Sequence, residues 1–359
     1  MPARERTLQR MSVALGTLAA IVLGEILLRL GAALSGPRVG GVAATAEVLA
    51  PGVAGDCRRQ RSQATLAALV RPSRVPDLIY ELKPDLDTCF QGVRVRTSAD
   101  GLRAEASVRR PKPPGVFRVL LLGDSQAFGW GLDEADTLGA RLSGELRGPG
   151  APEVEVVNAG VPGYNTAQEA AWLRARGLAY QPDCVMVLYI GNDLGLPTFL
   201  LRPQSALLAS RSLLLARLSR FFATGMRAEA ADPWWETPVL DDQKLLMDGD
   251  RPQVPPEYAH LVGVAGYRRA LRSLGDTAGA GRLPVVNVAD YGVPGVDWDA
   301  VHREQEALGI VHVEPRFPWT SPDVRLSEHD PHLSAQAVAE LARRVVAELK
   351  RRDVCLPPS

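Results

Sequence analysis

From residue 113 onward, short apolar segments alternate with segments whose apolar residues have helical spacing, and this alternation limits the folds open to the chain. The segment 182–193 (PDCVMVLYIGND) is apolar along nearly its whole length, as expected for a strand buried on both faces of a parallel sheet. Alternating strands and helices are typical of a doubly wound, flavodoxin-like α/β fold. We expect strands within 114–124, 153–158, 182–190, 282–291 and 309–315, and helices at 137–147, 166–177 and 334–351.

Polar residues follow the first three predicted strands, at the end of the sheet where this fold gathers its active site. Gly123-Asp124-Ser125 ends the first strand, residues 158–165 follow the second, and Gly191-Asn192-Asp193 follows the third. A further polar group, residues 328–332, lies near the start of the last helix. Together these segments supply a hydroxyl, glycine N–H groups, an amide side chain and an imidazole. Acyl transfer needs a nucleophile, a base and preorganised oxyanion donors, so the pattern favours that chemistry.

These segments resemble the four motifs of the SGNH (GDSL-type) hydrolases. The resemblance implies that Ser125 is the nucleophile and that its backbone N–H is one oxyanion donor. It also implies that Asn192 donates to the oxyanion through its side chain and that His332 is the general base. The glycine donor of the second motif is implied to be Gly163, with Gly160 as the alternative. The matching residues are GDSQ at 123–126, NAGVPGYN at 158–165, GND at 191–193 and DPHLS at 330–334.

The acid of the expected triad departs from the family pattern. The family commonly places an aspartate three residues before the histidine, and here that position is His329. Asp330, two residues before His332, is our choice for the carboxylate that orients the imidazole, and Glu328 is the second candidate. A serine–histidine dyad without a carboxylate is the remaining alternative.

The first 34 residues have the pattern of a transmembrane signal-anchor. Residues 1–10 carry three arginines and one acid, and residues 11–34 are apolar apart from Glu25 and Arg29, which can pair on one helical face. The apolar segment is about the length that a bilayer core requires, roughly 20 residues. Because the basic flank comes first, we expect a cytoplasmic N-terminus and an extracytoplasmic catalytic domain. A cleaved signal peptide and a buried soluble helix are the alternatives.

The segments around the catalytic domain, residues 113–352, are less regular. Residues 35–75 are predicted as a linker or stalk and 76–112 as a short β-type prelude, in which Arg103 is a candidate for facing the site. Outside the cytoplasm disulfides can form, and Cys57 with Cys89 is the nearest candidate pair, with unpaired thiols as the alternative. Residues 197–260 form an insert, a candidate lid or a structural cover of the sheet edge, and residues 353–359 are a C-terminal tail.

Charge and ligand spacing exclude several other classes of protein. The chain has 41 basic and 41 acidic side chains, so it lacks the positive excess that nucleic-acid binding needs. The four cysteines form no CxxC pattern, and His329 with His332 has no third cluster that would complete a metal site. We therefore expect neither a metal nor a cofactor.

The sequence thus predicts a membrane-anchored, extracytoplasmic serine ester hydrolase that cleaves an acyl ester, such as an acetyl ester, through an acyl-serine intermediate. A glycan or a lipid is the candidate carrier of the ester. The first alternative is an O-acyltransferase that uses the same site on an envelope or secreted glycan. The second alternative is a non-catalytic binding protein with the SGNH fold.

Overall fold

The computed structural model describes residues 22–27, 30, 57–59, 63–148, 150, 152–201, 235–236, 254–289 and 293–358. The chain divides into two compact units, residues 1–42 with 201–236 and residues 43–200 with 237–359. Everything described below on the sheet and the site belongs to the second unit.

Little of the first unit is described. Residues 22–27 and 30 are helical, with exposed apolar side chains, and the rest of the predicted anchor, 11–34, lies outside the described residues. Within the described ranges, no helix combines the length and the apolar character needed to cross a membrane. The transmembrane helix therefore stays a prediction.

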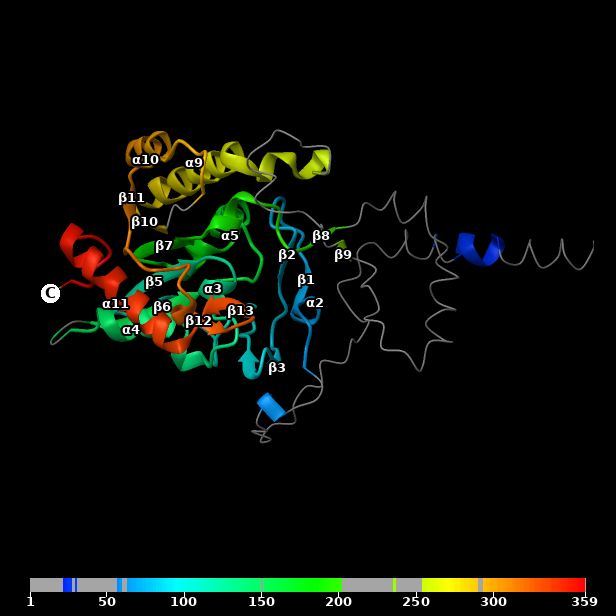
Figure 1. Cartoon of the computed structure of the whole chain (residues 1–359), viewed down its shortest axis with the longest axis horizontal. Coiled ribbons are helices and arrows are strands. Elements are labelled where there is room, and N and C mark those ends of the chain that lie inside the picture. Colours follow the sequence, from blue (N-terminus) through cyan, green and yellow to red (C-terminus); the bar gives the residue numbers. More distant parts are fainter. Residues whose placement is uncertain are drawn as a thin grey trace, which may run out of the picture. The chain divides into compact units, whose positions relative to one another are not determined.

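Five parallel strands form the central sheet of the second unit (Figure 1). Each pair of neighbouring strands is parallel, so the predicted α/β fold with a parallel sheet is confirmed. β5, the first strand of this sheet in the sequence, lies inside it: β6 follows on one side, and β7, β10 and β11 follow on the other. This order places a topological switch point between β5 and β7. In spatial order the strands are β11 (Ile310–Val313), β10 (Val285–Ala289), β7 (Cys184–Tyr189), β5 (Val116–Leu122) and β6 (Glu153–Asn158).

Helices cover both faces of the sheet, and side chains cap several of them. Asn165 forms a capping box with Gln168 at the start of α5, and the Thr137 and Ser334 hydroxyls cap α4 and α11. Such caps satisfy N–H groups that have no partner within a helix. The helices are α4 (Leu138–Leu146), α5 (Thr166–Ala175), α9 (Gly263–Gly281), α10 (Trp298–Ala307) and α11 (Ala335–Arg352).

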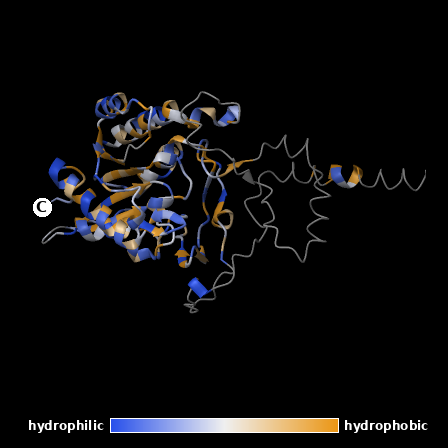
Figure 2. Ribbon diagram, in the orientation of Figure 1, coloured by the Kyte–Doolittle hydropathy of each residue, from blue (hydrophilic) through white to orange (hydrophobic). Residues whose placement is uncertain are grey.

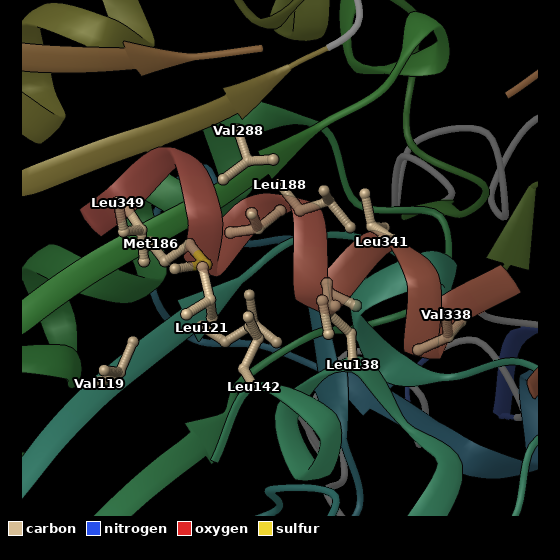
Figure 3. Packing of buried hydrophobic residues seen from close by; sticks show 14 of the residues in the cluster. Val119, Leu121, Leu138, Leu142, Met186, Leu188, Val288, Val338, Leu341 and Leu349 are labelled. Atoms are coloured by element: carbon tan, nitrogen blue, oxygen red, sulfur yellow. The ribbon is translucent and has the colours of Figure 1, made fainter. Parts of the chain in front are cut away.

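The main core lies between the sheet and the pair α4 and α11. Met186 of β7, Leu142 of α4 and Leu341 of α11 belong to one buried cluster, and their side chains converge in Figure 3. On the opposite side α5 packs against α9 (Figure 1). Because both faces are covered, every residue of β5 is buried, and the central strands are coloured as hydrophobic in Figure 2. This arrangement explains the nearly continuous apolar character of the strands.

Two short antiparallel hairpins form the prelude. β1 (Val70–Pro72) pairs with β2 (Tyr80–Leu82), and β3 (Asp87–Phe90) pairs with β4 (Val93–Arg96). The first hairpin begins inside the segment predicted as a linker, because β1 and the preceding helix α2 (Leu66–Leu69) bury apolar side chains.

Two disulfides cross-link the second unit. Cys57 is bonded to Cys89, the pair that the sequence offered as the nearest candidate, and this bond joins the segment predicted as a linker to β3. Cys184 of β7 is bonded to Cys355, which follows α11. The second bond joins residues 171 positions apart and was not predicted.

Most of the predicted insert, 197–260, lies outside the described residues. The described parts include β8 (Leu200–Leu201), β9 (Trp235–Glu236) and the 3-10 helix η5 (Pro256–Leu261). The roles considered for the insert stay predictions.

Candidate active site

Ser125 lies at the end of β5, the first residue of the short helix α3 (Ser125–Phe128). Asp124 caps this helix by accepting a hydrogen bond from the Gln126 N–H at 2.9 Å. Gly123 makes the turn possible, because a Cβ there would lie 2.6 Å from the Cβ of Ala127. The serine is therefore presented at the switch point of the sheet, where the fold is expected to carry its site.

His332 comes to Ser125 from a hairpin formed by β12 (Arg325–Ser327) and β13 (Asp330–Leu333). The Ser125 Oγ is 2.9 Å from His332 Nε2. On the other side of the ring, Nδ1 is 2.6 Å from Asp330 Oδ1, which also accepts the His332 backbone N–H at 3.0 Å. An ionised carboxylate only accepts hydrogen bonds, so Nδ1 carries the hydrogen and Nε2 is free to accept the serine proton.

Asp330 is held in its ionised form. Burial by itself would raise the pKa of this carboxyl, but hydrogen bonds from the His332 backbone and ring, the nearby imidazole charge and the Trp130 indole N–H together lower it. Glu328 and His329 are exposed in the turn between β12 and β13, and no hydrogen bond from either to His332 occurs in the described part of the chain. Of the candidate acids, Asp330 is therefore the one placed against the imidazole.

Asn192 lies in the short helix η4 (Gly191–Leu194) that follows β7, across the switch point from Ser125. Its side-chain amide donates to Asp124 Oδ2 at 3.0 Å, and the Ser125 Oγ is 3.2 Å from the same oxygen. Asp124 is fully buried, and this burial raises the pKa of its carboxyl despite the opposing hydrogen bonds from Asn192 and Gln126. One buried carboxyl thus links the expected nucleophile to an expected oxyanion donor.

The two glycines of the second motif differ in what their N–H groups can do. The Gly160 N–H donates to the Asn158 side chain at 3.0 Å, and a Cβ at Gly160 would lie 2.4 Å from the backbone nitrogen of Phe128. Gly163 has φ of +76°, and a Cβ there would lie 1.9 Å from the Thr198 Oγ1. Because the Gly160 N–H already has a partner, the geometry favours Gly163 as the glycine donor.

The prelude holds the second motif in place. The Tyr80 hydroxyl of β2 donates to the Pro162 carbonyl at 3.0 Å, and the Tyr164 hydroxyl donates back to the Tyr80 carbonyl. From the other side, the Thr198 N–H donates to the Gly163 carbonyl at 3.0 Å. The turn that carries Gly163 is therefore clamped between two other segments.

Two further carboxyls are buried beside the site. Glu169 of α5 and Asp193 of η4 are each 1% exposed. Asp193 accepts hydrogen bonds from the Ile190 N–H at 2.6 Å and the Thr166 hydroxyl at 3.0 Å, whereas neither carboxyl oxygen of Glu169 has a hydrogen-bond partner among the described residues. Burial, together with the charges of neighbouring carboxyls, raises the pKa of both groups well above the usual range.

In the ranges that the structure describes, no group of three or more histidine, cysteine or acidic side chains is suited to hold a metal ion. What the site does assemble is a hydroxyl, an imidazole and a carboxylate in hydrogen-bonding order, with amide donors nearby.

The sequence patterns missed one residue beside His332 and misplaced another. The ring of Trp130 stacks on that of His332, and its indole N–H donates to Asp330 Oδ2 at 3.1 Å. Arg103, a candidate for facing the site, is instead buried and donates to backbone carbonyls of residues 128–132. The run Phe-Gly-Trp-Gly at 128–131, directly after the nucleophile, is the sequence signal that could have pointed to Trp130.

Comparison with known proteins agrees with the motifs. The model of the GDSL-like Lipase/Acylhydrolase family matches residues 121–312, more than half of the chain. No curated protein sequence matches significantly.

Among solved structures, the lipase/acylhydrolase from Enterococcus faecalis is similar at 19% identity, covering 66% of this chain and 96% of that chain, with a TM-score of 0.39. TesA is similar at 17% identity, covering 65% and 98% of the two chains, with a TM-score of 0.41. The SGNH-hydrolase family esterase AlinE4 is similar at 18% identity, covering 67% and 98%, with a TM-score of 0.36.

The family match includes the segments of Ser125, Gly163 and Asn192, and it confirms the expectation of a hydrolase that acts on ester bonds. This chain belongs to the GDSL-like lipase/acylhydrolase family.

Proposed function

We propose that this chain is an extracytoplasmic serine hydrolase that cleaves acyl esters through an acyl-serine intermediate, with Ser125, His332 and Asp330 as its catalytic triad. The observation that carries the proposal is the continuous hydrogen-bonded chain from the Ser125 hydroxyl through both ring nitrogens of His332 to the Asp330 carboxylate. Such a chain converts a weakly nucleophilic hydroxyl into an effective nucleophile.

In the acylation step, Ser125 Oγ forms a bond to the carbonyl carbon of the ester while its proton passes to His332 Nε2. The carbonyl electron pair moves to oxygen and produces a tetrahedral oxyanion. When this intermediate collapses, the bond to the leaving oxygen breaks, and His332 returns its proton to that oxygen. Asp330 stabilises the imidazolium that exists between the two proton transfers.

Three donors are proposed for the oxyanion: the backbone N–H groups of Ser125 and Gly163 and the side-chain amide of Asn192. An amide group has two hydrogens, so Asn192 can hold Asp124 with one and offer the other to the oxyanion. Donors fixed in this way cost little reorganisation when the charge develops.

Deacylation repeats the chemistry with water as the nucleophile. His332 removes a proton from the water, whose oxygen attacks the acyl carbon, and the proton returns to Ser125 Oγ as the acyl–serine bond breaks. The products are a carboxylic acid and the free enzyme, and no cofactor is consumed.

The test of the proposed mechanism is covalent labelling of the full-length protein with a fluorophosphonate, which reacts with activated serines. The wild-type protein and the control variant Ser273→Ala, altered on α9, should be labelled, and Ser125→Ala and His332→Ala should not. A series of p-nitrophenyl esters of increasing acyl length then identifies the preferred acyl group. A folded wild-type protein that is neither labelled nor active would overturn the proposal.

The proposed location outside the cytoplasm is supported by the two disulfides, because such bonds persist mainly in oxidising compartments. The arginines before residues 11–34 support an anchor with its N-terminus in the cytoplasm. A reporter that is active only outside the cytoplasm, fused after residue 359, should therefore be active. If only a cytoplasmic reporter is active there, the proposed location is wrong.

A further inference from the structure

Trp130 contacts both members of the His332–Asp330 pair. The rings of Trp130 and His332 are stacked, with centroids 4.6 Å apart and planes 9° from parallel. The same indole donates its N–H to Asp330 Oδ2 at 3.1 Å. One side chain therefore touches the imidazole through its face and the carboxylate through its edge.

These contacts restrict the two motions that would misalign the pair. Asp330 Oδ1 accepts from the His332 backbone and ring, so the indole occupies the second carboxylate oxygen and opposes rotation of the carboxylate. The stacked indole opposes tilting of the imidazole plane, which would move Nε2 away from the Ser125 Oγ. Because both His332 and Asp330 are only partly buried, with side chains 20% and 26% exposed, the surrounding core does not fix them by itself.

The loop that carries Trp130 is itself held rigidly. Gly129 and Gly131 flank it with φ of +86° and +68°, and a Cβ at Gly131 would lie 2.3 Å from Leu326 Cδ2. Arg103 donates to the Phe128 carbonyl at 2.8 Å and also to the carbonyls of residues 129 and 132. The tight turn and the buried guanidinium leave the loop few alternative conformations.

The prelude supplies a second support. Phe90 of β3 meets the Trp130 ring edge-on, with centroids 4.8 Å apart and planes 81° from parallel. Phe90 is 1% exposed and follows Cys89, which the disulfide joins to Cys57. The indole thus contacts both Phe90 and His332.

We propose that Trp130 is a positioning residue, which keeps the His332–Asp330 pair aligned for proton transfer and is braced by Phe90 of the disulfide-linked prelude. The inference rests on the proposed function, because it assigns Trp130 a role in that same triad. The prelude then belongs to the working active site and is more than a connection to the preceding chain.

Kinetics of two Trp130 variants separate the two contacts. Trp130→Phe keeps a stacked ring and loses the N–H, and we expect kcat to fall about tenfold. Trp130→Leu loses both contacts, and kcat should fall about 100-fold, with KM within about threefold of wild type. Phe90→Leu should lower kcat by a smaller factor, about threefold, because Trp130 retains its own contacts to the pair. A general loss of structure would not produce this graded effect confined to kcat.

A double-mutant cycle tests whether the indole acts through the carboxylate. In an Asp330→Asn background, Trp130→Phe should cost less than about twofold, because the charge that the N–H stabilises is already gone. The matched control is Trp319→Phe, since the Trp319 N–H has no hydrogen-bond partner among the described residues. This control should leave kcat unchanged.

A spectroscopic measurement distinguishes failure of this inference from failure of the proposed function. The imidazole N–H that faces Asp330 should give a downfield proton resonance in the wild-type protein, and this resonance should be lost or broadened in folded Trp130→Leu. The inference would be overturned by an unchanged resonance or a kcat within about twofold of wild type in Trp130→Leu. It would also be overturned if Trp130→Phe lowered kcat by the same factor in the wild-type and the Asp330→Asn backgrounds. If the wild-type protein fails the fluorophosphonate test, the proposed function itself is wrong. A labelled wild-type protein with an unchanged resonance in Trp130→Leu instead refutes the role of Trp130 alone.

Discussion

The side-chain amide of Asn192 donates a hydrogen bond to the buried carboxyl of Asp124, with 3.0 Å between Nδ2 and Oδ2. Because the Ser125 Oγ is 3.2 Å from the same oxygen, Asp124 fixes the relative positions of the hydroxyl and the amide. The two groups directly follow strands β5 and β7, which are neighbours in the sheet although 68 positions separate Asp124 and Asn192 in the chain.

Replacing Asn192 tests its role as an oxyanion donor. Asn192→Ala removes one preorganised donor, so kcat should fall about 10²–10³-fold with KM little changed. Asn192→Asp has nearly the same shape but cannot donate when ionised, and it should lose at least as much activity. Steady-state kinetics of both variants check this expectation. Activity within about threefold of wild type in either variant would show that Asn192 is not a donor.

The triad acid is tested by two matched amide substitutions. Asp330→Asn removes the charge that holds the His332 tautomer, so kcat should fall about 10²–10⁴-fold, towards the loss in His332→Ala. Glu328→Gln alters an exposed carboxyl in the adjacent turn and should cost less than about twofold. Measured kcat values in the reverse order would transfer the role to Glu328, and full activity in the double variant would indicate a serine–histidine dyad.

Gly163→Ala should damage both stability and activity. The new Cβ would overlap the Thr198 side chain at a position with φ of +76°, so we expect a loss of about 1–3 kcal/mol in the free energy of unfolding. The matched control is Gly144→Ala in α4, where a Cβ meets nothing within 4 Å and should stabilise the helix by up to about 1 kcal/mol. Urea denaturation of the two variants gives the comparison, and a Gly163→Ala variant as stable as wild type would contradict the close packing of this turn.

The buried carboxyl of Glu169 predicts a pH-dependent stability. The pKa of Glu169 is raised in the folded state and is about 4.3 in the unfolded chain. At pH values above about 4.3, the folded protein therefore binds more protons than the unfolded chain. The stabilising contribution is complete below that pH and is lost as the pH rises through the folded pKa. Glu169→Gln keeps the shape of the side chain without its charge. The variant should therefore be more stable than wild type at neutral pH, and its free energy of unfolding should change less with pH. Unfolding measured from pH 4 to pH 9 checks this, with exposed Glu306→Gln as a control that retains the wild-type slope.

The Cys184–Cys355 bond should contribute strongly to stability. It closes a loop across 171 positions and ties the end of the chain to the central strand β7. Replacing both cysteines by alanine should lower the free energy of unfolding by about 2–5 kcal/mol. Activity in the folded state should change little, because neither residue contacts the triad. Equal stability of the variant and the oxidised wild type would show that the bond contributes nothing to stability.

Much of the fold could be read from the sequence because its signals are local. Apolar runs such as 116–122, bounded by glycine turns and followed by helical spacing, predicted a parallel sheet and the strand ends that carry Ser125 and Asn192. The motifs then indicated which types of side chain would gather at those ends.

Other features depended on contacts that no local pattern records. Which carboxylate lies against His332 depended on the direction of each side chain in the hairpin, and which glycine N–H is already bonded depended on the fold of the second motif. β1 was predicted as part of a linker because it is recognisable as a strand only through its pairing with β2, which follows later in the chain.

By itself, then, the sequence determined the parallel α/β fold, the family and the segments that meet at the site, since strand periodicity and motif order are properties of neighbouring residues. Only the tertiary structure decided that Trp130 stacks on a histidine 202 positions away (332 minus 130) and that Cys184 is bonded to Cys355. The physical reason is that such contacts depend on how helices and hairpins pack on the sheet and on where each side chain points after packing, and neither is encoded in the spacing of residues along the chain.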